Sequence, residues 1–141
     1  MIQRIQSIYL VAGALVIGSI YFLDDVWRGR AAVGSSWFTA VTLGIFGICI
    51  VGAFLAVFLY KDRKRQRSIV VLLQIFTILG LVTLFIGEYL GGTLPFIGTE
   101  SEGLEEGIGI ALAVIGYGLF YMARRGIEKD IELIKSADRL R

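Results

Sequence analysis

The chain has 141 residues, room for one domain, and 56% of them are hydrophobic while only 18% are charged. The charged residues gather in short stretches between long charge-free runs, which is typical of membrane spans joined by loops. There is no histidine and one cysteine, Cys49, inside an apolar run. These counts exclude an intrachain disulfide, histidine-ligated haem or metal, and a Ser-His or Cys-His nucleophile pair. We expect no catalytic residue, no metal site and no cofactor.

A first span is predicted over residues 5–23. Arg4 precedes this run, as in a signal peptide, but the run is longer than a usual signal-peptide core. It also ends in FLDD and not in a small-x-small cleavage site, so we expect a retained helix. A polar loop is predicted from Asp24 to Trp37.

The second span, residues 38–60, has no charge over its whole length, enough to cross roughly 30 Å of hydrocarbon. The segment KDRKRQR at 61–67 then predicts a tight basic turn. The third span is assigned to residues 68–90, followed by an acidic, glycine-rich loop. The fourth span is assigned to 105–122, because the apolar run from Gly107 to Met122 alone is short for a membrane.

Residues 123–141 are too charged for the bilayer but are predicted to continue the fourth span as an amphipathic helix. Ile127, Ile131 and Ile134 recur at helical spacing there. The sequence therefore predicts a single all-α domain, residues 1–141, that is a polytopic integral membrane protein with four transmembrane helices.

The charge distribution predicts the orientation of these spans. If both termini and the 61–67 turn share one side, that side holds all of the 14 Lys and Arg residues except Arg28 and Arg30. The positive-inside rule assigns this side to the cytoplasm. Both termini are therefore expected to be cytoplasmic.

The basic turn is the first predicted interaction surface, formed by Lys61, Arg63, Lys64, Arg65 and Arg67. One interpretation is a topology signal that contacts anionic lipid headgroups. The other is a docking patch for an acidic protein surface or for the chain's own tail. Nucleic acid binding is not expected, because the patch is short and lies against a membrane.

The charged tail is the second predicted interaction surface, with Arg124 and Arg125 at its start. Asp130 and Asp138 fall within the helical arc of the isoleucines, where a solvated or lipid-lying helix would not place carboxylates. We therefore expect this face to pack on protein and one Asp to pair with Arg63, Arg65 or Arg67. The alternative is a helix of imperfect amphipathicity.

Three residues are candidates for an intramembrane polar site: Gln74, Thr77 and Glu88. Glu88 lies near the outer end of its span beside Tyr89, so we expect an interfacial side chain that water reaches, with proton or cation coupling as the alternative. Gln74 and Thr77 are expected to bond across helices or to their own backbone, and otherwise to line a polar seam.

Small residues recur four positions apart in the spans, which favours close helix packing within the monomer or against a partner's helix. The pairs are Ala14 with Gly18, Gly52 with Ala56, Gly107 with Ala111, and Gly109 with Ala113.

The opening MIQRIQSIYL, the turn YKDRKRQ and the tail ARRGIEKDIELIKSADRLR are the distinctive segments. In these the chain resembles an uncharacterised family of small four-helix membrane proteins from Bacteroidota, domain-of-unknown-function family 4293. The resemblance implies a bacterial inner membrane and supplies no activity.

The expected function is that of a non-enzymatic accessory or scaffold subunit of an inner-membrane complex. Its expected partners are membrane lipids and another membrane protein or a second copy of itself. The alternative is a small homo-oligomeric transporter, channel or lipid-binding protein.

Overall fold

The structure is a computed structural model that describes residues 2–28, 32, 36–92 and 104–139, without the side chains of 2–4, 25, 36, 138 and 139. It is all-helical, with no strand in these ranges. The elements are α1 (Ile2–Ser19), the 3-10 turn η1 (Ile20–Phe22), α2 (Asp24–Arg28), α4 (Ser36–Phe58), α5 (Arg63–Gly91) and α6 (Leu104–Arg139).

Four of these helices are long and apolar enough to cross a membrane, which confirms the predicted number of spans. The candidate segments are Ile5–Phe22, Trp37–Phe58, Arg63–Gly91 and Leu104–Ala137. Between 28% and 33% of each segment is buried inside the bundle, so most of the apolar surface faces outward, as a lipid-facing exterior requires. The chain is a multi-pass membrane protein by the length and composition of these helices.

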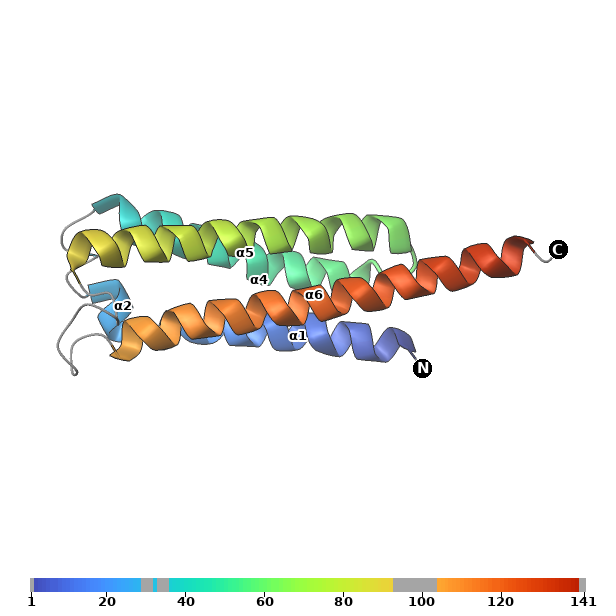
Figure 1. Cartoon of the computed structure of the whole chain (residues 1–141), viewed down its shortest axis with the longest axis horizontal. Helices are drawn as coiled ribbons and strands as arrows, with labels where there is room; N and C mark the ends of the chain where they lie inside the picture. The colour runs from blue at the N-terminus through green and yellow to red at the C-terminus, as the bar shows by residue number, and fades with distance from the viewer. Residues whose placement is uncertain (1, 29–31, 33–35, 93–103, 140–141) are drawn as a thin grey trace.

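The four long helices form a ring in which α1 packs on α4 and α6, and α5 packs on α4 and α6 (Figure 1). Both ends of the described chain and the α4–α5 turn lie at one end of the bundle (Figure 1). The short α2, the start of α4, the end of α5 and the start of α6 lie at the other end (Figure 1).

The turns differ from the predicted boundaries. The basic turn expected at 61–67 is shorter, because the Asp62 side chain accepts a hydrogen bond from the backbone N–H of Arg65 at 3.1 Å and caps α5. Arg63 to Arg67 are therefore helical. Within the loop predicted from Asp24 to Trp37, α2 forms five helical residues. At the fourth span, α6 begins at Leu104 and runs unbroken for 36 residues.

Phenylalanine rings packed on glycines bring the helices close together. A Cβ atom on Gly87 would lie 2.1 Å from the Phe38 ring, and one on Gly80 would lie 2.5 Å from the Phe46 ring. Both contacts join α4 to α5, and both rings are fully buried. Gly13 of α1 accommodates Phe120 of α6 in the same way, at 2.7 Å. The core is therefore built from rings seated where a neighbouring helix has no side chain.

The predicted small-residue pairs contribute to this packing only in part. Gly52 lies against Leu73, where a Cβ atom on the glycine would lie 2.6 Å from Leu73 Cδ2, and Ala56 is buried. A Cβ atom on Gly109 would lie 3.5 Å from Val26 Cγ2, which is ordinary contact, and Ala113 is buried, whereas Ala111 is exposed. The tightest glycine contacts, at Gly87 and Gly80, were not singled out from the sequence.

Candidate functional site

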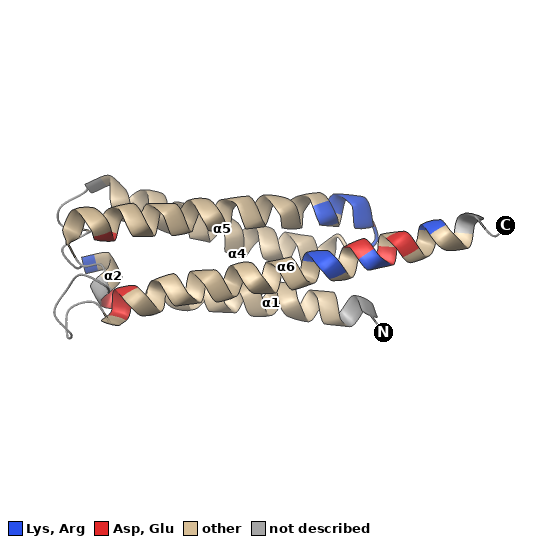
Figure 2. Cartoon of the chain, viewed as in Figure 1, with Lys and Arg blue, Asp and Glu red and all other residues tan. Residues whose placement is uncertain are grey.

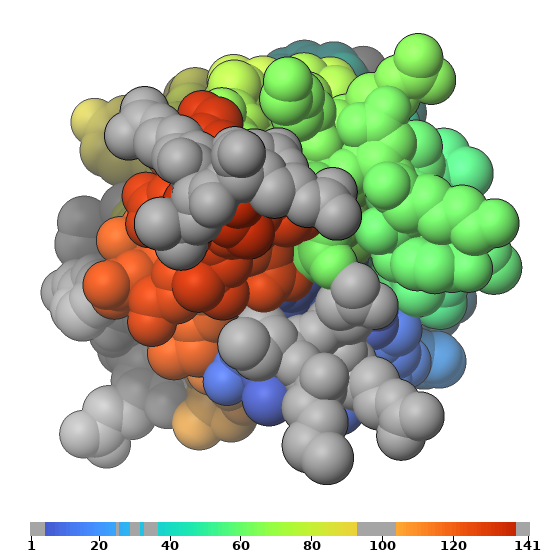
Figure 3. Space-filling view, turned by 90° about the vertical axis from the view of Figure 1, so that its right-hand side faces the viewer, coloured from blue at the N-terminus to red at the C-terminus, as the bar shows by residue number. Residues whose placement is uncertain are grey.

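A polar cluster lies at the end of the bundle where α1, the start of α5 and the charged part of α6 meet. Figure 2 shows basic residues at the start of α5 and alternating basic and acidic residues along the far half of α6 at this end, while the acidic residues of α5 and of the start of α6 lie at the opposite end. Viewed end-on, coloured parts of α5 and of α1 lie beside α6 on this face (Figure 3), and α6 packs on both helices. The cluster is thus assembled from segments far apart in the sequence.

Asp130 of α6 is the centre of the buried part of the cluster and is only 7% exposed. Its Oδ2 atom accepts a hydrogen bond from Gln6 Nε2 of α1 at 2.8 Å, and it forms an ion pair with Arg63, the first residue of α5. One carboxylate therefore joins three helices. This is the pairing expected from the sequence, with Arg63 as the partner; the side chain of Asp138 lies outside the described residues.

A glycine makes room for this arrangement. A Cβ atom on Gly126 would lie 2.8 Å from Gln6 Cγ, so the absence of a side chain at 126 lets Gln6 lie against α6 and reach Asp130 one turn further on. Neither Gln6 nor Gly126 was identified from the sequence. The signal that the sequence offered was Gln6 itself, a polar side chain about one turn into the predicted first span.

A second set of contacts surrounds Glu128 of α6. Arg67 Nε of α5 and Arg124 Nε of α6 both donate to Glu128 Oε1, at 2.8 Å and 3.0 Å. Arg124 also donates through Nη1 to Gln74 Oε1 at 3.4 Å, which carries the polar contacts down into the apolar part of α5. Glu128 was missed from the sequence, although its spacing of four from Arg124 is that of a helical ion pair.

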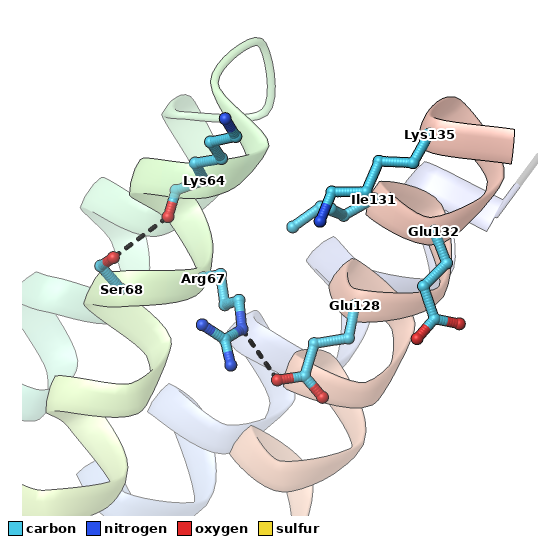
Figure 4. A pocket seen from close by; sticks show the side chains of 7 residues that line it. All are labelled: Lys64, Arg67, Ser68, Glu128, Ile131, Glu132 and Lys135. Carbon is cyan, nitrogen blue, oxygen red and sulfur yellow. Dashed lines mark hydrogen bonds and ion pairs between the residues drawn. The ribbon is translucent and has the colours of Figure 1, made fainter. Parts of the chain in front are cut away.

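A groove of about 520 Å³ runs between α5 and α6 beside this ion pair (Figure 4). Its α5 wall is formed by Lys64, Arg67 and Ser68, and its α6 wall by Glu128, Ile131, Glu132 and Lys135. In Figure 4 the Arg67 guanidinium bridges the walls through Glu128, and Lys64 and Lys135 extend from opposite walls. The groove is large enough for a small ligand.

The other predicted interaction residues lie outside the cluster. Arg65 Nε forms an ion pair at 3.1 Å with Oδ2 of Asp62, the residue that caps the start of α5. Lys61 Nζ lies 6.0 Å from the centre of the Tyr60 ring. Arg125 is exposed on α6. The structure therefore brings together Arg63, Arg67, Arg124 and Asp130, while Lys64 joins the wall of the groove.

The expected exposure of Glu88 is wrong. Glu88 is 0% exposed, whereas its neighbour Tyr89 is 69% exposed. Glu88 follows the buried Leu84 by four positions, and this spacing turns it toward the interior of the bundle even though it lies near the end of α5. Glu106, in the first turn of α6, was not singled out from the sequence and is also buried; the start of α6 lies at the same end of the bundle as the end of α5 (Figure 1).

Gln74 and Thr77 are both buried on the inner face of α5. Thr77 Oγ1 donates to the Leu73 carbonyl at 2.8 Å, one of the two bonding modes expected for it. Gln74 bonds across helices to Arg124, the other expected mode, but its Nε2 atom has no hydrogen-bond partner among the described residues. Among those residues there is no group of three or more His, Cys, Asp or Glu side chains able to hold a metal ion.

Comparison with known proteins identifies the family of the chain. No curated protein and no solved structure matches it. A family model described as "Domain of unknown function (DUF4293)" matches residues 2–140, which is nearly the whole chain and includes every residue of the cluster described above. The chain belongs to the DUF4293 family.

Proposed function

We propose that the chain is a bacterial inner-membrane protein with both termini in the cytoplasm, and that it serves as a non-enzymatic accessory subunit of a membrane complex. In this proposal the charged part of α6 projects into the cytoplasm and docks a partner protein. The orientation and the docking surface rest on separate observations and are tested separately.

The orientation is supported by the separation of charge along the bundle. Most Lys and Arg residues lie at the end that carries both termini, where acidic residues of α6 alternate with them (Figure 2). The buried carboxylates Glu88, near the end of α5, and Glu106, near the start of α6, belong to the other end. Positively charged residues are retained on the cytoplasmic side of bacterial membranes, so the basic end is assigned to the cytoplasm.

Cysteine labelling tests this assignment. In a Cys49→Ala background, a cysteine placed at the exposed Lys61 is expected to react with a membrane-impermeant maleimide only after the inner membrane is permeabilised. A cysteine at the exposed Asp24 is expected to react in spheroplasts with an intact inner membrane. The opposite pattern would reverse the orientation.

The docking surface is carried by one observation: the apolar face of α6 extends beyond the surface that buries it. Ile127 is fully buried against the bundle and Ile131 is partly buried, but Leu133 and Ile134 are 57% and 51% exposed. Figure 1 shows this end of α6 reaching past the ends of the other long helices. A helix that presents apolar residues beyond its own bundle is suited to lie in a groove of another protein.

Quantitative co-purification from the native membrane in a mild detergent tests the docking surface. Leu133→Gln with Ile134→Gln is expected to lower the recovery of a stoichiometric partner at least tenfold. The matched control, Leu133→Met with Ile134→Val, keeps the surface apolar and is expected to retain the partner. A wild-type chain that runs alone under these conditions would contradict the proposal.

A further inference from the structure

We propose that the groove between α5 and α6 binds the phosphate headgroup of an anionic membrane phospholipid. The groove has a volume of about 520 Å³ and is lined on both walls by long charged side chains (Figure 4). A bound phosphate would lie between Lys64 and Lys135, above the Arg67–Glu128 ion pair. This site is distinct from the exposed Leu133 and Ile134 surface proposed to dock a protein.

The charges inside the groove favour an anion. Glu128 Oε1 accepts from two guanidinium groups, Arg67 at 2.8 Å and Arg124 at 3.0 Å, so two positive charges share one negative charge. Lys64 and Lys135 add two ammonium groups from opposite walls. Glu132 also lines the α6 wall, so the lining carries the three positive charges of Lys64, Arg67 and Lys135 against the carboxylates of Glu128 and Glu132.

The Arg67–Glu128–Arg124 contacts also hold the walls at a fixed separation. Arg67 comes from α5 and Arg124 from α6, and the carboxylate between them joins the two helices. Bidentate or paired guanidinium contacts restrict side chains more than single ammonium contacts do. Lys64 and Lys135 are exposed and remain free to close on a ligand from either side.

The position of the groove selects a lipid over a soluble phosphate. On α5 the groove ends at Ser68, directly before the apolar stretch that begins at Ile69, and on α6 its first lining residue, Glu128, lies in the charged part of the helix beyond Met122. This is the boundary at which phospholipid phosphates lie. Leu72 and Ile75, one and two turns from Ser68 on the same face of α5, are each 50% exposed and provide an apolar surface for an acyl chain.

Native mass spectrometry of the purified full chain in neutral detergent tests the site with defined lipids. Dioleoyl phosphatidylglycerol is expected to bind at least tenfold more tightly than dioleoyl phosphatidylcholine. A tenfold molar excess of inorganic phosphate over the lipid is expected to leave the phosphatidylglycerol bound. Displacement by inorganic phosphate would overturn the lipid assignment, and equal binding of the two lipids would overturn the anionic site.

Matched charge-removing variants locate the site. Lys64→Gln with Lys135→Gln is expected to weaken phosphatidylglycerol binding at least tenfold, because it removes both groove lysines. Lys61→Gln with Lys129→Gln removes the same charge from exposed lysines outside the groove lining and is expected to change binding less than twofold. Equal losses in the two variants would assign the effect to general surface charge and overturn the proposal. All four lysines are exposed, so both proteins are expected to keep the melting temperature of the wild type.

Discussion

Asp130 near the end of α6 is ion-paired with Arg63 at the start of α5, and both side chains are largely buried, at 9% and 15% exposure. The pair fixes the position at which α6 leaves the bundle, because Arg63 is the first residue of its helix. Gln6 Nε2 of α1 donates a hydrogen bond to the same Asp130 carboxylate at 2.8 Å, so a third helix is joined to the pair. The projecting part of α6 is therefore anchored at one point, and the stability of this anchor can be measured.

Asp130→Asn should destabilise the protein, since it leaves the buried Arg63 guanidinium without its counter-charge. Removing one partner of a buried ion pair costs about 3 kcal/mol. The measurement is thermal unfolding in detergent, followed by tryptophan fluorescence. Glu132→Gln removes the same charge at an exposed position of α6 and should change stability by less than about 0.5 kcal/mol.

The double variant Arg63→Met with Asp130→Asn should melt closer to the wild type than Asp130→Asn does. Arg63→Met removes the buried charge that Asp130→Asn leaves unpaired, so the effects of the two substitutions on stability are not additive. An additive double variant would show that the two side chains do not interact.

Gly126→Ala should destabilise the protein because the new Cβ would lie 2.8 Å from Gln6 Cγ and 3.2 Å from Gln6 Nε2. Gln6 can move aside only by losing its bond to Asp130. Overpacking of this kind costs about 1–3 kcal/mol. Gly118→Ala on the same helix meets nothing within 4 Å and should instead raise stability, by up to about 1 kcal/mol, through better helix propensity. Opposite shifts in melting temperature are the expected result, and equal shifts would refute the contact.

Gly87→Ala should be destabilising for a different reason, since its Cβ would lie 2.1 Å from the ring of Phe38. The ring is fully buried in a close-packed core, so either the ring or the two helices α4 and α5 must shift to admit the new Cβ atom. The control is Gly44→Ala, which meets nothing within 4 Å. Phe38→Leu in the Gly87→Ala background should recover part of the lost melting temperature, and a further loss would count against this packing.

Gln74→Met should raise the melting temperature. The Gln74 Nε2 atom is buried without a partner among the described residues, and an unsatisfied buried donor costs about 1–3 kcal/mol. The bond that Gln74 accepts from Arg124 is long, at 3.4 Å, and Arg124 keeps its contact with Glu128 at 3.0 Å. Met fills a similar volume without a polar atom. A lower melting temperature would mean that the contact with Arg124 stabilises more than the unpaired donor costs.

The number of membrane-crossing helices was predictable because hydropathy and length are properties of a continuous segment. The pairing of a tail aspartate with a basic residue of the 61–67 segment was also predictable, because a carboxylate within an apolar helical arc needs a partner. Which arginine it meets was not, since Arg63 and Arg67 lie four residues apart on one face of α5 and both reach α6. Only the packing of α5 on α6 decides that Arg63 pairs with Asp130 and Arg67 with Glu128.

The error at Glu88 has a related cause. Its position near the end of α5 indicated exposure to water, but exposure depends on the rotation of the helix about its axis, and the packing of Gly80 and Gly87 on Phe46 and Phe38 sets that rotation.

The inward face of α4 could not be predicted either. The α4 sequence is apolar on every face, so no periodic pattern distinguishes its buried side from its outward side.

The sequence by itself therefore determined the helices, their order and the separation of charge between the two ends, because each follows from local composition along the chain. Only the tertiary structure decided which glycines receive aromatic rings, that Gln6 and Arg63 share Asp130, and that a groove opens between Lys64 and Lys135. The physical reason is that these contacts depend on the rotation and depth of one helix against another. In a protein with an apolar exterior, side-chain packing between helices sets both quantities, and hydropathy does not.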